Sequence, residues 1–244
     1  MSTALSALRS SLYTLLQIII TPPYALIALV TFPFSPLIRY RVISGWAKIM
    51  LFLARVICGV RYQVLGAEHI PSIPCIVLSK HQSAWETMAF QQIFPPQVWV
   101  LKRELLRIPF FGWGLAMTSP IAIDRASRGE ALKQMLEQGK DRLQQGFWIV
   151  IFPEGTRMAP GQAGKYRIGG AWLATHTGAL VVPVAHNAGE FWGKNSFIKL
   201  PGTITVSIGV PINPAGMKPD ELNVRVEAWI EAEVVRISGQ GVNG

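Results

Sequence analysis

From residue 61 onward, short apolar runs alternate with longer stretches in which apolar residues recur at helical spacing. The short runs predict buried strands, and the longer stretches predict amphipathic helices. The expected strands are residues 75–79, 97–101, 120–123, 147–152, 180–185 and 203–210, and the expected helices include 84–93, 128–144, 168–177 and 220–237. This alternation is typical of an α/β domain.

The first sixty residues follow a different pattern. No charged residue occurs from Ser10 to Ile38, and a straight helix over these 29 positions would reach about 44 Å, against about 30 Å for a hydrocarbon core. The Pro22-Pro23 pair is expected to interrupt this helix, so a membrane span and a bent helix pair within one leaflet both fit. A cleaved signal peptide fits poorly, because the apolar run is too long and no small-x-small cleavage site follows it.

A second apolar stretch, residues 46–60, carries Lys48 and Arg55 on one helical face. This pattern predicts an amphipathic helix that lies at a membrane interface. We therefore divide the 244 residues into an N-terminal membrane-associated helical segment, residues 1–60, and a single globular domain, residues 61–244.

The position of the charge distinguishes membrane from nucleic acid as a partner. The net charge is +9, yet residues 1–67 contain six basic and no acidic side chains, while the rest of the chain carries 17 basic and 14 acidic ones. A basic, apolar and acid-free segment suits an anionic lipid surface better than a nucleic-acid groove. We expect membrane phospholipid and no nucleic acid as a partner.

The cysteines and histidines narrow the chemistry further. Cys58 and Cys75 both lie among apolar residues, so they are expected to be buried free thiols in a reducing compartment. No two histidines have a metal-ligand spacing such as H-E-x-x-H. We expect no metal site.

One histidine stands where α/β proteins keep reactive groups. His81 directly follows the strand predicted at 75–79, and Glu86 follows five residues later at the start of a predicted helix. A histidine can take a proton from a hydroxyl when a carboxylate holds its other ring nitrogen. A loop histidine beside a solvated acid has the same spacing, so the pair alone does not distinguish the two interpretations.

Three further segments carry candidate binding groups. Residues 152–157 end a strand at proline and then place Glu154, Gly155, Thr156 and Arg157 in a turn, whose backbone N–H groups and guanidinium suit a phosphate. Residues 100–114 put Lys102 and Arg103 beside an apolar, aromatic patch. Pro183 lies inside the predicted strand 180–185, which predicts an edge strand or a strand end. A solvated turn and an ordinary helix start remain alternatives for the first two segments.

In this order, these segments resemble the four motif blocks of the glycerolipid acyltransferase family that includes the 1-acylglycerol-3-phosphate acyltransferases. The blocks are His81 to Glu86, in place of H-x-x-x-x-D, then Lys102 to Gly114, the F-P-E-G-T-R of residues 152–157, and residues 182–187 around Pro183. Arg167 falls in a segment that stands where the family has F-K-x-G. The resemblance covers roughly residues 61–210, and Glu86 departs from the family's aspartate.

The resemblance implies a mixed β-sheet flanked by helices, with membrane-contacting N-terminal helices, and makes residues 61–244 an acyltransferase catalytic domain. It implies that His81 and Glu86 act as a dyad and that Arg157 binds the acceptor's phosphate. We expect Arg103, Lys102 and Arg167 as further candidate cations for that phosphate. The expected reaction moves a fatty acyl group from acyl-CoA or acyl carrier protein, with no cofactor, to the 2-hydroxyl of lysophosphatidic acid.

The expected location is the cytoplasmic face of the inner membrane. Acylation of another lysolipid, such as a lysophospholipid or a lyso-aminolipid, is the alternative within enzymes. A non-catalytic module that binds anionic lipid is the alternative outside them.

Overall fold

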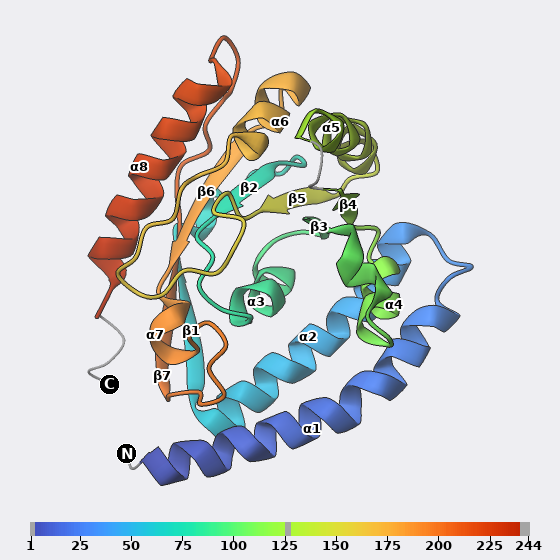
Figure 1. Ribbon diagram of the computed structural model, residues 1–244, viewed down its shortest axis with the longest axis vertical. Coiled ribbons are helices and arrows are strands. Elements are labelled where there is room, and N and C mark those ends of the chain that lie inside the picture. The colour runs from blue at the N-terminus through green and yellow to red at the C-terminus, as the bar shows by residue number, and fades with distance from the viewer. Residues whose placement is uncertain (1–2, 125–127, 240–244) are drawn as a thin grey trace.

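A computed structural model describes residues 3–124 and 128–239, and these residues form one mixed, seven-stranded sheet covered by helices (Figure 1). The sheet order is β1-β7-β6-β2-β5-β3-β4. All neighbouring strands are parallel except β6 and β7, which pair antiparallel. The strands are β1 (Val60–Leu65), β2 (Ile76–Ser79), β3 (Gln97–Lys102), β4 (Ile121–Ile123), β5 (Trp148–Ile151), β6 (Val181–His186) and β7 (Gly202–Ile208).

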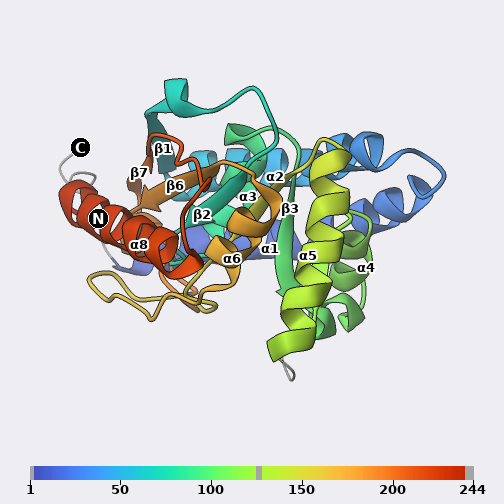
Figure 2. The same cartoon turned by 90° about the horizontal axis from the view of Figure 1, so that it is seen from above.

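Helices cover both faces of the sheet, as Figure 2 shows from above. On one side lie α5 (Arg128–Gln144), α6 (Gly169–Thr177) and α8 (Pro219–Ile237), and on the other lie α2 (Pro36–Cys58) and α3 (Trp85–Ile93). The strands β2, β5 and β6 are buried along their whole length, as interior strands between two helical layers must be. Short helices complete the fold: η1 (Ala67–His69), η2 (Arg103–Arg107), α4 (Phe111–Ala116) and α7 (Ala188–Phe191).

The six expected strands and four expected helices are present, with ends shifted by a few residues. The sequence pattern missed β1, because its buried Val60 is followed by three exposed residues and strict alternation is lost. It also missed α4, whose six residues are too few to display a helical period.

The N-terminal segment forms two long helices, and the expected break at Pro22-Pro23 is wrong. Helix α1 (Thr3–Val30) runs through both prolines and curves along the domain (Figure 1). Contacts on both sides of the prolines hold it in place: Trp46 Nε1 donates to Thr21 Oγ1 at 3.2 Å, and the Tyr24 hydroxyl donates to the Val42 carbonyl at 2.6 Å. The chain turns at residues 31–35 instead.

The second helix begins ten residues before the predicted residue 46. Pro36 starts α2, because proline at the first helical position loses no hydrogen bond. The helix ends at Cys58, and the following Gly59 has a φ of 72°, the left-handed conformation common after a helix C-terminus. Of the described helices, α1 alone has the length and apolar composition needed to cross a bilayer.

Pro183 is not in an edge strand, contrary to the sequence prediction. Strand β6 lies between β7 and β2 in the sheet interior. Pro183 has no N–H to donate to β7. The proline is tolerated because β7 ends at Ile208, and Pro183 lies opposite the chain that follows this end. Its carbonyl still accepts a hydrogen bond from the Gly209 N–H at 2.9 Å.

Candidate active site

The strand order brings the sequence motifs together at one edge of the sheet. Strands β2, β5 and β3 are parallel neighbours, so their carboxyl ends lie side by side. His81 follows β2, residues 152–157 follow β5, and Lys102 ends β3. Groups separated by as many as 76 positions in the chain thus surround one space, at the sheet edge where α/β proteins bind ligands.

His81 and Glu86 form a hydrogen-bonded pair. Nδ1 of His81 lies 2.7 Å from Oε1 of Glu86. The longer glutamate arm therefore reaches the imidazole, although the family motif has aspartate. A carboxylate at Nδ1 favours the tautomer with its proton on that nitrogen, which leaves Nε2 as the basic atom. The His81 side chain is 14% exposed and the Glu86 side chain is fully buried.

Backbone groups fix the Glu86 carboxylate. Its Oε1 also accepts the N–H groups of Gln82 at 3.0 Å and Ser83 at 2.8 Å. Burial by itself would raise the pKa of Glu86, but the electrostatic interactions with His186 and His81 and the hydrogen bonds from His81 and the Ser83 N–H outweigh it, so the pKa is lowered. Glu86 is consequently a carboxylate near neutral pH and can stabilise a positively charged imidazole.

The main chain and ring of His81 are held independently of Glu86. Its N–H donates to Oε2 of Glu154 at 3.0 Å, and its carbonyl accepts the Met158 N–H at 2.8 Å. The imidazole stacks on the Phe152 ring with centroids 4.0 Å apart. Residues of the turn after β5 therefore set the position of the histidine that follows β2.

The turn at residues 152–157 is a tight one. The Gly155 N–H donates to the Phe152 carbonyl at 3.0 Å, and Gly155 has a φ of 68°, which favours glycine. This N–H is therefore engaged within the turn. Thr156 is exposed.

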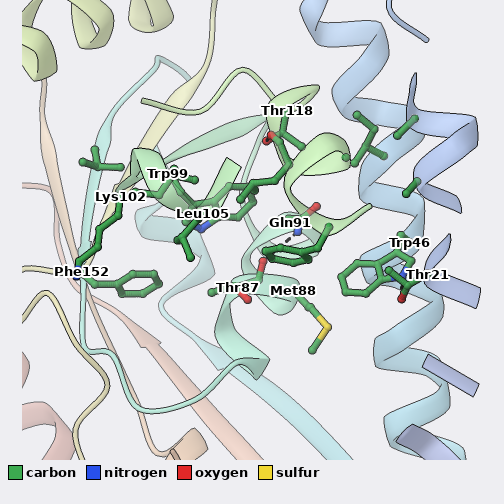
Figure 3. A pocket seen from close by; sticks show the side chains of 18 of the residues that line it. Thr21, Trp46, Thr87, Met88, Gln91, Trp99, Lys102, Leu105, Thr118 and Phe152 are labelled. Carbon is green, nitrogen blue, oxygen red and sulfur yellow. Dashed lines mark hydrogen bonds between the residues drawn. The ribbon is translucent and has the colours of Figure 1, made fainter. Parts of the chain in front are cut away.

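An apolar cavity of about 440 Å³ extends from the His81 pair to the N-terminal helices. Figure 3 shows Phe152 and Lys102 at one end and Thr21 and Trp46 at the other. The walls between them come from α3, β3, η2 and α4, and their lining residues include Met88, Gln91, Trp99, Leu105 and Leu115. The cavity thus has a polar end beside His81 and a long apolar body.

The predicted cations divide into two groups. Arg157 and Lys102 line the cavity together with His81 and Gly155. Arg103 and Arg167 are exposed and are not among the described residues that line it. Arg103 instead lies 3.4 Å from the Gln134 side chain. Pro183 does not line the cavity either, and its contribution is confined to the β6 backbone.

Two buried groups near the pair carry no clear sequence signal. His186 is fully buried, its Nε2 donates to the Lys80 carbonyl at 2.9 Å, and burial lowers its pKa. His186 is therefore a hydrogen-bonded polar residue at the end of β6. Lys80 is also buried and lies 2.7 Å from Glu154. A lysine in a strand-end loop is normally solvated, so only the tertiary structure identifies this ion pair.

Three comparisons with known proteins agree with this geometry. The profile of the Acyltransferase family matches residues 61–187. The chain is 50% identical over 204 residues to the 1-acyl-sn-glycerol-3-phosphate acyltransferase of Pseudomonas aeruginosa, covering 82% of this chain and 79% of that one. It is 31% identical to the alpha enzyme of the same name from Bos taurus, over 72% of this chain and 62% of that one.

A solved structure has the same fold. The crystal structure of the 1-acyl-sn-glycerophosphate acyltransferase from Thermotoga maritima superposes with a TM-score of 0.78, at 23% identity and with 95% of each chain covered. This likeness confirms the expected mixed sheet flanked by helices.

Proposed function

The chain belongs to the Acyltransferase family, and on this basis we propose that it transfers a fatty acyl group to the 2-hydroxyl of lysophosphatidic acid, giving phosphatidic acid. The observation that carries the proposal is the His81 and Glu86 pair at the polar end of an apolar cavity that Arg157 also lines. A base, an anion-binding side chain and an apolar space are the three things this reaction needs. Membership of an enzyme family argues against the alternative of a non-catalytic lipid-binding module.

In the proposed mechanism, Nε2 of His81 removes the proton of the acceptor's hydroxyl as that oxygen attacks the thioester carbonyl. The Glu86 carboxylate stabilises the imidazolium that forms. The tetrahedral intermediate then collapses, the carbon–sulfur bond breaks, and the departing thiolate takes the proton from His81. Since the acceptor itself is the nucleophile, the reaction requires no acyl-enzyme.

The acceptor's phosphate is assigned to Arg157, with Lys102 as the second cation. A guanidinium binds phosphate through two parallel hydrogen bonds. Arg157 lines the same cavity as His81. Holding the phosphate places the hydroxyl beside the base and converts binding energy into proximity. Arg103 and Arg167 have a smaller role in this proposal, because their exposed side chains lie outside the cavity lining.

The apolar body of the cavity is assigned to an acyl chain. Each methylene moved from water into such a space gains about 0.8 kcal/mol. The donor is an acyl thioester on coenzyme A or acyl carrier protein, and its carrier remains in solvent while the chain enters the cavity.

The chain associates with membranes through its apolar N-terminal helix, and we place it on the cytoplasmic face of the inner membrane. Helix α1 exposes many large apolar side chains, such as Leu8, Leu15 and Ile18. However, Tyr13 packs edge-on against Trp192, and Ser10 Oγ accepts the Lys199 N–H at 2.9 Å. Because α1 contacts the globular domain near its start, at Trp192 and Lys199, and contacts it again at helix α4, the structure favours a helix lying in one leaflet over one that spans.

The experiment that tests this proposal is a radiolabelled transfer assay with the purified enzyme in detergent or phospholipid vesicles. It crosses two donors, acyl-CoA and acyl carrier protein, with lysophosphatidic acid, a neutral monoacylglycerol and lysophospholipids with larger head groups. Lysophosphatidic acid is expected to give the highest kcat/KM with at least one donor. Preference for a lysophospholipid with a larger head group would contradict the acceptor assignment and support the alternative acceptor class.

A further inference from the structure

A buried charge cluster links the C-terminal helix α8 to the residue before His81. Nζ of Lys80 donates to Oε1 of Glu154 at 2.7 Å, to the Gln162 carbonyl at 3.0 Å and to Oε1 of Glu231 at 2.8 Å. The Lys80 side chain is 1% exposed. An ammonium group has three donors, so every one of them is matched by an acceptor in a region with little access to water.

The same cluster reaches the His81 main chain through Glu154. One oxygen of this carboxylate accepts the Lys80 ammonium, and the other accepts the His81 N–H at 3.0 Å. The Glu154 side chain is fully buried, so it has no solvent to replace either partner. The Gly164 N–H also donates to Oε1 at 3.2 Å, so the Lys80 ammonium and this N–H together determine where Glu154 can hold His81.

Glu231 is the member of this cluster that lies farthest along the chain from the sequence motifs. It extends from α8, is 26% exposed, and its Oε1 also accepts the Tyr166 hydroxyl at 2.8 Å. Buried ion pairs contribute little net stability, because the desolvation of both charges cancels most of their attraction. A partly exposed glutamate that shares the ammonium with Glu154 is better explained by its effect on geometry, because it fixes the position of the Lys80 ammonium.

We propose that Glu231 is a positioning residue for His81. It holds the Lys80 ammonium against Glu154, and Glu154 in turn fixes the His81 peptide so that the imidazole meets both Glu86 and the acceptor hydroxyl. Loss of the Glu231 negative charge leaves Glu154 as the carboxylate that alone balances the Lys80 ammonium among the described contacts, and Lys80 and Glu154 then rearrange. This inference rests on the catalytic role proposed above for His81.

The test compares Glu231→Gln with a matched control, Glu227→Gln, which removes the same charge one turn earlier on α8. Rates are measured per folded molecule, with folding checked by circular dichroism and thermal unfolding. For Glu231→Gln, kcat is expected to fall about tenfold, since a shift well under 1 Å at the base is enough for such a loss. The KM for lysophosphatidic acid is expected to stay within about twofold of wild type, as is every parameter of Glu227→Gln.

A second variant, Tyr166→Phe, removes one hydrogen bond from Glu231 without changing any charge. This variant is expected to lower kcat by a smaller factor than Glu231→Gln does. An unchanged kcat in Glu231→Gln together with a lower unfolding temperature would show a purely structural role and overturn the inference. A raised KM with unchanged kcat would overturn it too. Failure of the underlying His81 assignment is distinguishable, because it would leave His81→Ala active.

Discussion

Replacing Glu86 by aspartate tests whether the dyad depends on side-chain length. The motif of the family has aspartate at this position, so motif matching alone predicts that Glu86→Asp is harmless. The structure predicts the opposite. Removing one methylene withdraws the carboxylate by about 1.5 Å, the length of one carbon–carbon bond. The contact to His81 Nδ1, now 2.7 Å, would then exceed hydrogen-bonding distance.

The backbone cannot easily follow the shorter side chain. Trp85 and Met88 on the same helix are buried in the core, and the Ser83 N–H is oriented toward the present carboxylate position. A misplacement of about 1 Å in a catalytic group costs up to about 100-fold in rate, equivalent to about 2.7 kcal/mol of transition-state stabilisation. We therefore expect kcat of Glu86→Asp to fall by about that factor, with little change in KM.

The assay is steady-state transfer of labelled acyl groups to lysophosphatidic acid at saturating donor. Glu68→Asp is the matched control, because Glu68 is exposed on η1 and has no role in the proposed mechanism. Near-normal kcat in Glu86→Asp would refute the reasoning, since it would show that the site adjusts freely to the shorter side chain.

Three other predictions follow from the same geometry. Arg157→Ala should raise the KM for lysophosphatidic acid about tenfold or more in steady-state assays, and Arg103→Ala should raise it less; equal effects would contradict the phosphate assignment. Ala25→Phe fills the cavity end at α1 and should shift a panel of donors toward shorter acyl chains; an unchanged profile would place the chain elsewhere. The pKa of Glu86 in the folded protein lies below its ordinary value of 4.5. As the pH falls below 4.5, the Glu86 carboxylate is therefore protonated in the unfolded chain before it is protonated in the folded one. Urea unfolding should therefore show a larger loss of stability below about pH 4.5 in wild type than in Glu86→Gln; parallel losses would contradict the lowered pKa.

The sheet could be predicted from the sequence because its interior strands are short apolar runs bounded by polar turns. The edge strand β1 could not, since a half-exposed strand that begins with buried Val60 lacks strict alternation. The rules that proline interrupts a helix and is confined to the edge of a sheet also failed, at Pro22-Pro23 and at Pro183. At both places contacts with distant chain segments decide the local structure. Contacts to α2 keep α1 helical through its prolines, and the end of β7 gives Pro183 a place inside the sheet.

In the candidate site, too, some residues could be predicted from the sequence and others could not. His81, Glu86 and Arg157 could be identified because they lie close to motif positions, and the parallel strand order explains why they meet. The pairing of Lys80 with Glu231 could not be identified, since the two residues are separated by 151 positions and neither lies in a distinctive pattern. Buried charges acquire their partners from tertiary structure, which short sequence motifs do not encode.

The most direct test of the proposed mechanism is single-turnover acyl transfer by His81→Ala, measured with lysophosphatidic acid and a labelled thioester. Wild type and variant are compared at equal amounts of folded protein bound to the same vesicles. Because removal of a general base costs about 100-fold to 10,000-fold, we predict a loss of at least about 100-fold in the variant. Transfer at a near-normal rate would contradict the assignment of His81 as the base.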